Sequence, residues 1–295
     1  MDKVGVVVLN YINYTDTIQC VNYLCAQSGV ELEIVVVDNN SPNSSYEIIT
    51  QAFSHQNIDI IINTENDGYA KGNNLGLRIL CGRDVDWLLI VNPDTYFTDK
   101  YAIKDMIKQA VGLVDAGIIG PRVVKENGRT IMPYFNQPNL LNLLFEDYVR
   151  MLLYPVWYIV EKYIKRPFKV FRVHGCCMLG PTKVWQQAGF LDENTFLYWE
   201  ETIFSYRVKL LGYKTYYVPN VELVHCHDIR LSDLSTTKLR FELESLNHFL
   251  LAYMRYGAFA RKLVKLVRLT GYSIRSYAAF LVSRLLSNIS IRKAQ

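Results

Sequence analysis

The sequence lacks the signatures of several common protein classes. No apolar run reaches the roughly 18 to 20 residues that span a bilayer, and the chain does not start with a basic segment, a long apolar run and a small-residue cleavage site. We therefore expect neither a transmembrane helix nor a secretory signal. The six cysteines show no CxxC spacing, which favours reduced thiols in the cytosol over a disulfide framework. No GxGxxG or GxxxxGKS/T motif is present, which disfavours a NAD enzyme and a P-loop nucleotidase.

Negative charge is missing from Ser245 to Gln295, a stretch that carries nine Lys and Arg residues. Because the whole chain has a net charge of +4, the first 244 residues carry −5. Leu, Phe and Tyr recur at helical spacing over 239–270 and 273–287. We predict that these helices lie on an anionic membrane surface, or alternatively that they pack on the rest of the chain or on a second copy of it. Nucleic acid is not favoured as a partner, because no recognition motif accompanies the charge.

The first 120 residues alternate between short apolar runs and helical stretches. Such alternation is typical of βαβ units around a parallel sheet that is buried on both faces. We predict strands at 4–9, 33–37, 58–62 and 87–91 and helices at 16–26, 45–53 and 72–80.

The second half is less regular, and no internal repeat or low-complexity linker interrupts it. We predict strands at 116–124, 171–179, 215–218 and 221–224 and helices at 140–165, 181–188 and 200–211. The strand at 171–179 would deliver His174 and Gly175, and the last strand would deliver His225. We predict a domain at residues 1–238, which consists of two halves at 1–120 and 121–238. A basic helical extension at 239–295 follows it.

Two acidic residues follow predicted strands directly. Asp38 ends IVVVD and could accept hydrogen bonds from a ribose or a base, although a turn or helix cap is an equally ordinary role for such a residue. Asp94 lies in Asn92-Pro93-Asp94-Thr95 and could bind Mg²⁺ or Mn²⁺ together with substrate phosphates, although Asp in such a turn is often only turn chemistry.

A pair of acids, Glu200 and Glu201, follows the aromatic stretch 196–199 and opens a predicted helix. One acid could act as a base while its neighbour orients a substrate, because aromatic side chains desolvate carboxylates and stack on sugar rings. The alternative is simple helix-dipole complementarity. The cluster His225-Cys226-His227 does not favour zinc, since no second ligand pair has metal-site spacing. His174 is as readily a packed structural histidine as a site residue.

Five segments together carry a resemblance to a known family: VVLNY at 7–11, VVVDNNS at 35–41, NDGYAKGNNLG at 66–76, LLIVNPDT at 88–95, and the region 175–213 with AGFLDENTFLYWEE. In this order the chain resembles a family 2 inverting glycosyltransferase of the GT-A fold, in the bacterial rhamnosyltransferase-like branch, over about residues 3–230. The resemblance implies an α/β fold with a mixed nucleotide-binding sheet flanked by helices, ahead of the C-terminal extension.

The resemblance also implies roles for individual residues. It makes Glu201 the base, Asp94 and His225 ligands of Mn²⁺ or Mg²⁺, and His174, Gly175, Trp199 and Glu200 acceptor contacts. The implied donor contacts are Leu9, Asn10, Tyr11, Asp38, Asn66, Gly68, Lys71, Asn73, Asn92, Pro93, Asp94 and Arg230. Two positions depart from the family pattern, because Glu-Glu replaces the usual Glu-Asp and Asn92 replaces the first acid of the DxD motif.

The implied activity is transfer of a sugar from a nucleoside diphosphate sugar, dTDP-rhamnose or a UDP-hexose, to a hydroxyl of a glycan with inversion. We expect the glycan to be lipid-linked, and the protein to work in cell-surface polysaccharide synthesis at the cytoplasmic face of the cell membrane. A homo-oligomer through the C-terminal helices is a further expectation. The alternatives are a sugar-nucleotidyltransferase, and a non-catalytic glycan- or membrane-binding partner in a polysaccharide assembly complex.

Overall fold

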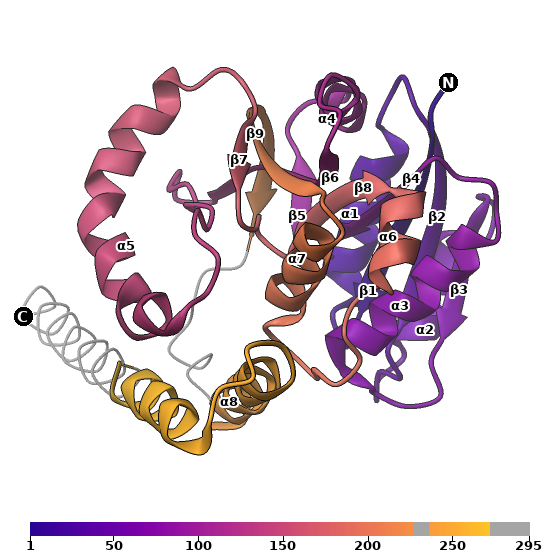
Figure 1. Ribbon diagram of the computed structural model, residues 1–295. Helices are drawn as coiled ribbons and strands as arrows, with labels where there is room; N and C mark the ends of the chain where they lie inside the picture. The colour runs from indigo at the N-terminus through magenta and orange to yellow at the C-terminus, as the bar shows by residue number, and fades with distance from the viewer. Residues whose placement is uncertain (227–235, 272–295) are drawn as a thin grey trace, which may run out of the picture.

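A nine-stranded mixed β-sheet forms the centre of the computed structural model, which describes residues 1–226 and 236–271 (Figure 1). The strand order is β3-β2-β1-β4-β8-β6-β9-β5, with β7 also paired to β9. The strands are β1 (Lys3–Asn10), β2 (Glu31–Asp38), β3 (Ile58–Ile62), β4 (Trp87–Val91), β5 (Thr95–Phe97), β6 (Ala116–Lys125), β7 (Phe168–Val170), β8 (Cys177–Pro181) and β9 (Lys214–His225). Strands β1 to β4 run parallel to one another, and β8 runs antiparallel to β4.

Helices cover both faces of this sheet. They are α1 (Tyr14–Cys25), α2 (Ser45–Ala52), α3 (Gly68–Cys81), α4 (Ala102–Val111), α5 (Leu140–Val160), α6 (Thr182–Ala188), α7 (Glu200–Leu210) and α8 (Thr236–His248), with a 3-10 turn at Glu161–Tyr163 and a π-helical turn at Phe249–Tyr253. Successive strand residues point to opposite faces. In β1, Val6 and Val8 pack with α1, α2 and α4, whereas Val7 and Leu9 pack with α3, α6 and α7.

The predicted βαβ half is present, with differences at its margins. Helix α3 begins at Gly68, four residues before the predicted start, and the sequence analysis did not predict β5 or α4. Helix α5 ends at Val160 and gives way to the 3-10 turn, so the predicted helix to residue 165 is too long.

Two strand predictions in the second half are wrong. The predicted strand 171–179 is divided, because Phe171 N and Arg172 N both donate to Tyr134 O and turn the chain out of the sheet. His174 and Gly175 therefore lie in the turn before β8 rather than in a strand. The two predicted strands 215–218 and 221–224 are the single strand β9, which shifts register against β6 between Pro121 and Arg122.

The predicted continuous helix 239–270 is also wrong, because the described part of the extension folds back on the sheet domain. Helix α8 leads into the π-helical turn, Arg255 takes a left-handed backbone (φ 53°), and a second helix covers 258–271. A separate apolar cluster holds this extension: Leu246, Phe249 and Val264 are buried against Ile203 of α7 and Leu143 of α5. The predicted boundary at 238 falls inside α8, and the predicted helix 273–287 lies outside the described residues.

Candidate functional site

The carboxyl ends of β1 and β2 bring Asn10 and Asp38 side by side, fully buried. Asn10 Nδ2 donates to Asp38 Oδ2 at 2.5 Å, and Thr17 Oγ1 donates to Asn10 Oδ1 at 2.7 Å. Ser41 donates to Asp38 twice, from its backbone N and from its Oγ, both at 2.8 Å. Asp38 therefore shapes the 39–41 turn as an Asx-turn does, which is the ordinary role that the sequence left open. Its role toward a nucleoside remains a prediction.

The start of α3 fits closely against the segment before Glu200. Gly68 has φ +84°, and a β-carbon there would meet Phe196 O at 2.3 Å, so only glycine fits this close approach. Tyr69 N donates to Phe196 O at 2.7 Å, and Asn66 Oδ1 accepts from Gly68 N and from Asn39 Nδ2. The predicted residues Asn66 and Gly68 thus connect the β2 turn to the acid-bearing segment.

Tyr69 links the end of β4 to the turn before β8. Its Oη lies 2.8 Å from Asn92 Oδ1 and 3.1 Å from Gly175 O, and Asn92 N donates to Cys176 O at 2.9 Å. Burial raises the pKa of Tyr69 well above its ordinary value. The phenol therefore stays protonated and can act as a donor. The sequence analysis did not single out Tyr69, although it lies inside the NDGYAKGNNLG segment.

Asp94 and His225 meet at the same edge. His225 Nε2 lies 3.1 Å from Asp94 Oδ2, and Thr95 pairs with His225 where β5 runs antiparallel to β9. The ring of His174 lies 5.5 Å from that of His225. Burial, and then the charges of His225 and Arg172, lower the pKa of His174 from 6.5 to about 3, so its imidazole is neutral at physiological pH.

The donor set at this edge fits a hard or borderline divalent cation. A carboxylate and an imidazole are ligands that Mn²⁺ accepts, and a neutral His174 adds no positive charge against a cation. Cys176 also lies within 4.8 Å of the His174 and His225 ligand atoms, but burial and then Cys177 raise the pKa of its thiol well above the ordinary value. The thiol therefore stays protonated when no metal ion is bound.

A strained turn presents the acid pair. Tyr198 and Trp199 have φ of 69° and 70°, a left-handed backbone that aromatic side chains rarely adopt, and α7 starts immediately after them. Glu200 is buried, so burial, and then the charge of Glu201, raise the pKa of Glu200 well above its ordinary value. Burial therefore favours the protonated form of Glu200, which can donate a hydrogen bond beside Glu201 at the start of α7.

Arg172 is the partner of Glu201. Its Nη1 forms an ion pair with Glu201 Oε1, and both side chains are largely buried. Glu201 Oε2 is buried and has no hydrogen-bond partner among the described residues. Glu201 also lies beside the turn before β8, because a β-carbon on Gly175 would be 3.5 Å from Glu201 Cβ. The structure thus brings Glu201, Gly175, His174 and Arg172 together, and the sequence analysis missed Arg172.

The guanidinium of Arg172 lies on an aromatic ring that a second arginine shares. Arg172 Cζ is 3.5 Å from the centroid of the Tyr134 ring, and Arg150 Cζ is 3.7 Å from it. Arg150 belongs to α5 and also donates to Pro133 O at 2.7 Å. This stack fixes Arg172 against α5, and cation–π contacts of this kind stabilise by about 0.5–2 kcal/mol each.

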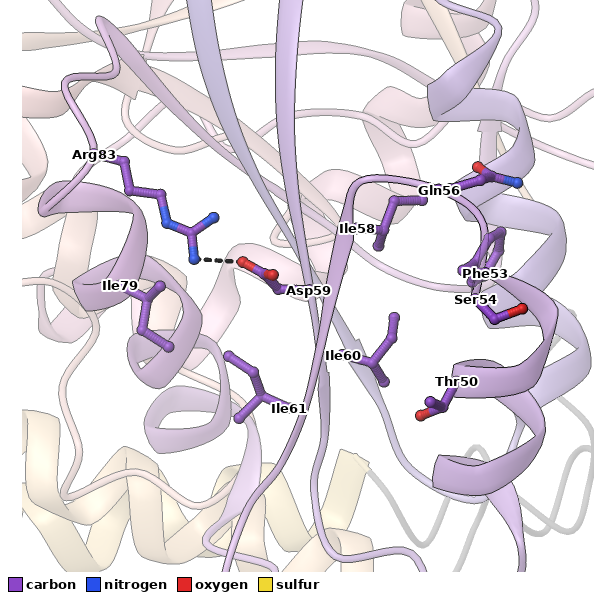
Figure 2. A pocket seen from close by; sticks show the side chains of 10 residues that line it. All are labelled: Thr50, Phe53, Ser54, Gln56, Ile58, Asp59, Ile60, Ile61, Ile79 and Arg83. Carbon is purple, nitrogen blue, oxygen red and sulfur yellow. Dashed lines mark ion pairs between the residues drawn. The ribbon is translucent and has the colours of Figure 1, made fainter.

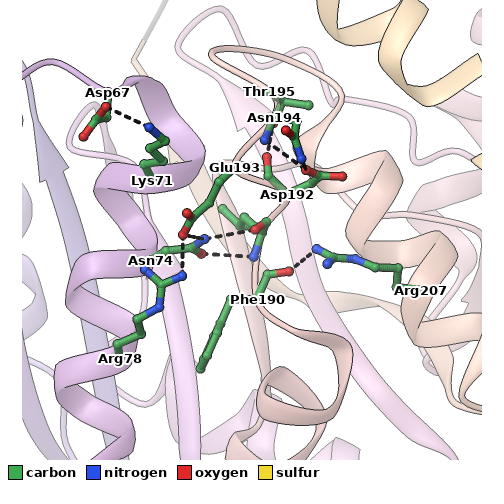
Figure 3. Close-up of polar contacts among 11 residues, drawn as sticks. Asp67, Lys71, Asn74, Arg78, Phe190, Asp192, Glu193, Asn194, Thr195 and Arg207 are labelled. Atoms are coloured by element: carbon green, nitrogen blue, oxygen red, sulfur yellow. Dashed lines mark hydrogen bonds and ion pairs between the residues drawn. The ribbon is translucent and has the colours of Figure 1, made fainter. Parts of the chain in front are cut away.

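Polar contacts from α3 and from the C-terminal extension hold the segment that precedes the acid pair. Asn74 of α3 accepts from Leu191 N at 3.0 Å and donates to Leu191 O at 2.9 Å. Figure 3 shows Arg78 of the same helix paired with Glu193. From the extension, His248 Nε2 lies 3.0 Å from Asp192 Oδ2, and Tyr253 Oη donates to the same oxygen. Burial opposes the charge on Asp192, but the bonds from Tyr253 and Asn194 lower its pKa overall.

The remaining predicted residues take different positions. Lys71 pairs with Asp67 at 3.0 Å on the exposed side of α3, whereas Asn73 is fully buried and donates to Tyr69 O. Trp199 stacks on Phe249 of the extension, with ring centroids 5.4 Å apart. Tyr11 is exposed at the end of β1, beside the buried Leu9 and Asn10, and Pro93 lies in the turn after β4. Arg230 lies outside the described residues. The roles of all these side chains stay predictions.

A large surface hollow, about 440 Å³, lies elsewhere. It follows the edge strand β3 between the ends of α2 and α3, and Arg83 and Asp59 form an ion pair across it (Figure 2). It contains none of the predicted site residues. Ligands of open α/β sheets bind outside the carboxyl ends of the strands, whereas this hollow includes Ile58 at the amino end of β3. The candidate site is thus set by side chains rather than by the size of a cavity.

Known proteins resemble this chain in sequence. The sequence model described as "Glycosyl transferase family 2" matches residues 4–186. The chain is 32% identical over 212 residues to "Low-salt glycan biosynthesis hexosyltransferase Agl10" of Haloferax volcanii, covering 71% of this chain and 62% of that protein. It is 23% identical over 210 residues to "N-acetylglucosaminyl-diphospho-decaprenol L-rhamnosyltransferase" of Mycobacterium tuberculosis, covering 66% of each. The chain therefore spans just under two thirds of the length of these relatives.

Solved structures resemble it in fold. S. aureus TarS 1-349 in complex with UDP-GlcNAc superposes with a TM-score of 0.55 at 16% identity, covering 90% of this chain and 71% of that one. GalNAc-T7 with UDP, GalNAc and Mn²⁺ superposes with a TM-score of 0.59 at 13% identity, covering 90% and 54%. These likenesses confirm the GT-A fold expected from the sequence.

Proposed function

Because the chain belongs to glycosyltransferase family 2, we propose that it transfers a sugar from a nucleoside diphosphate sugar to a hydroxyl of a glycan, with inversion. The rhamnosyl- and hexosyltransferase names of the relatives support dTDP-rhamnose or a UDP-hexose as the donor. The observation that carries the proposal is the buried Oε2 of Glu201, which has no hydrogen-bond partner among the described residues. Glu201 lies beside Gly175, in the turn that Tyr69 links to Asn92 at the end of β4.

The donor would lie at the carboxyl ends of β1, β2 and β4. Asn10 and Asp38 shape the nucleoside end of this edge, and Asp94 and His225 would hold Mn²⁺ or Mg²⁺ at the diphosphate end. When bound, such an ion neutralises the charge of the departing nucleoside diphosphate. The phenol of Tyr69 and the amide of Asn92 fix the turn before β8. The donor-binding residues are therefore held in a fixed position relative to the acceptor-binding residues.

Glu201 would remove the acceptor proton. Its Oε1 is held by Arg172, so the carboxylate has one defined orientation, and the buried Oε2 lacks a donor among the described residues. Buried atoms that can accept a hydrogen bond nearly always receive one, and the hydroxyl of the glycan substrate would donate this bond to Oε2. The hydroxyl oxygen then attacks the anomeric carbon while its proton passes to Oε2. The bond from the anomeric carbon to the diphosphate oxygen breaks, and the nucleoside diphosphate departs with that electron pair. Glu200, kept protonated by burial, can donate a hydrogen bond to the acceptor.

The acceptor is proposed to be a glycan on a lipid carrier, with the protein peripherally bound at the cytoplasmic face of the membrane. The name of the mycobacterial relative supports this, since its acceptor is a decaprenol-linked sugar diphosphate. Among the described residues no helix is both long and apolar enough to cross a bilayer. A surface association would give such an acceptor access to Glu201.

The test is Glu201→Gln, which keeps the size of the side chain and the contact region of Arg172 but cannot take a proton. We expect transfer to fall by about 10²- to 10⁴-fold, and the donor dissociation constant measured by calorimetry with Mn²⁺ to stay the same. Glu244→Gln, at an exposed position of α8, is the matched control. Transfer by Glu201→Gln at the control rate would disprove the base assignment. Release of pyrophosphate from a nucleoside triphosphate would instead indicate a sugar-nucleotidyltransferase.

A further inference from the structure

The charged side chains of helix α5 face other segments of the chain. Arg150 donates to Pro133 O and stacks on Tyr134, and Asp147 pairs with Arg268 of the extension at 2.6 Å. Burial raises the pKa of Glu146, the third charged residue of the helix. A helix at a water-exposed surface shows the reverse arrangement, with its apolar stripe on the core and its charges outside. The other side of α5 is therefore unusual for a surface in contact with water.

That outer side is a continuous apolar stripe. Only Leu143 and Trp157 of the helix are buried. Six large apolar side chains recur every three or four residues along one side and are each between 48% and 73% exposed: Leu141, Phe145, Val149, Leu152, Val156 and Ile159. No charged residue interrupts this outer stripe. An exposed apolar patch of this length indicates an interaction surface.

Basic residues lie at both ends of the outer stripe. Beyond the C-terminal end of α5, Lys162, Lys165 and Arg166 are all exposed. Near the other end lies the helix 258–271, which Arg268 joins to Asp147 and which carries Lys262 and Lys265 exposed to solvent (Figure 1). Phe259 on this helix is 81% exposed. Apolar side chains flanked by Lys and Arg are the features of a helix that binds in the plane of an anionic membrane.

We propose that the outer stripe of α5 lies in the interfacial layer of an anionic lipid bilayer, with the flanking Lys and Arg side chains on acidic headgroups. This deepens the membrane association proposed above, on which it rests, and it assigns the contact to α5 rather than to the tail alone. A second copy of the chain fits less well, because pairing two outer stripes would bring like-charged ends together, whereas anionic lipid attracts them.

The inner side of α5 connects this surface to the base. Arg150 and Arg172 both lie against the ring of Tyr134, and Arg172 pairs with Glu201. Only three side chains therefore separate α5 from the carboxylate that is proposed to receive the acceptor proton. A membrane at the outer stripe would hold a lipid-linked acceptor close to Glu201.

The test is flotation of the full-length protein with vesicles of phosphatidylcholine, either alone or with about 30 mol% phosphatidylglycerol. The double variant L152E/I159E puts two carboxylates into the outer stripe, and we expect its partitioning into anionic vesicles to fall by about tenfold or more. Val114→Glu, at a fully exposed position after α4, is the matched control and should bind like the wild type. K162E/K165E should weaken binding to the anionic vesicles only.

Two outcomes would overturn the proposal. The first is vesicle binding by L152E/I159E equal to that of Val114→Glu. The second is a wild-type dimer in lipid-free sedimentation that L152E/I159E converts to a monomer, which would make the outer stripe a contact between copies. Calorimetry of nucleotide-sugar binding in lipid-free solution reports on the proposed function separately, so a failure of donor binding is distinguishable from a failure of membrane binding.

Discussion

Phe249 is expected to be one of the most sensitive positions in the chain, although it lies in the C-terminal extension. It is fully buried and packs on the rings of Trp199, Tyr206 and Tyr253 at centroid distances of 5.4 to 6.0 Å. Truncating a buried Phe to Ala costs about 3–5 kcal/mol, and the loss of three ring partners places Phe249→Ala well inside that range. We expect about 4 kcal/mol, a large share of the roughly 5–15 kcal/mol that stabilise a typical domain.

The assay is urea unfolding, with Phe259→Ala as the matched control, because Phe259 is 81% exposed on the neighbouring helix. We expect the control to change the unfolding free energy by less than about 0.5 kcal/mol. Phe249→Ala should also lower the transfer rate at permissive temperature, because Trp199 directly precedes the acid pair and would lose the ring it packs on. Equal stability of the two variants would refute the packing argument.

The remaining predictions concern the site. Arg172→Gln should lower the rate of transfer by about 10²-fold or more while leaving donor binding unchanged, because Arg172 orients Glu201. Arg150→Gln should lower the rate less, because Arg150 contacts the same tyrosine ring but not Glu201. Equal losses in the two variants would contradict the role of Arg172 in positioning Glu201. Gly68→Ala should lower the free energy of unfolding in urea by about 2–4 kcal/mol, and Gly128→Ala by only about 1 kcal/mol. Both glycines have positive φ, but only at Gly68 would an added β-carbon meet a backbone oxygen. Equal losses in the two variants would disprove that steric clash. Lowering the pH from 7 to 5.5 should reduce the free energy of unfolding by about 1 kcal/mol through His174 alone. The reason is that the unfolded chain takes up a proton that the folded imidazole, with its pKa of about 3, does not. His174→Asn should reduce this dependence of the unfolding free energy on pH, and an unchanged dependence would contradict the prediction.

The sequence predicted those parts of the fold that depend on local pattern. The strands β1, β2 and β4 are buried on both faces, so their apolar runs are continuous. Asp38 is the last residue of β2, and Asp94 comes three residues after the end of β4. The same reasoning failed at 171–179. Phe171 and Arg172 fit the pattern of a strand, but their backbone N–H groups donate to Tyr134 O, which lies 37 and 38 residues earlier in the sequence. Nothing local to the sequence reports that contact.

The pairs that define the site are equally non-local. Arg172 and Glu201 are 29 residues apart, and Tyr69 and Gly175 are 106 residues apart, so neither pair could be predicted without the fold. The prediction of one continuous helix at 239–270 in the extension was wrong for a different reason. Its mixture of Leu and Phe with Lys and Arg resembles a surface helix, yet Phe249 and Val264 form a core against α7. A charge excess therefore predicts where a helix is polar, but it does not predict what its apolar side covers.

The reversal of direction between β4 and β8 has a consequence for how this scaffold can vary. Because the two strands are antiparallel, Val91 at the end of β4 pairs with Cys177 at the start of β8, and both adjoining turns open at the same edge. Inserting a residue into either turn would move Asn92 and Asp94 relative to Gly175, and the donor and acceptor halves would lose their alignment. At the opposite edge, where Trp87 pairs with Pro181, the exposed loop at Asp84 lies away from the reacting groups, so a change in its length would leave them in place. The scaffold can therefore diversify freely at one end of this strand pair, while the other end is held to a fixed length.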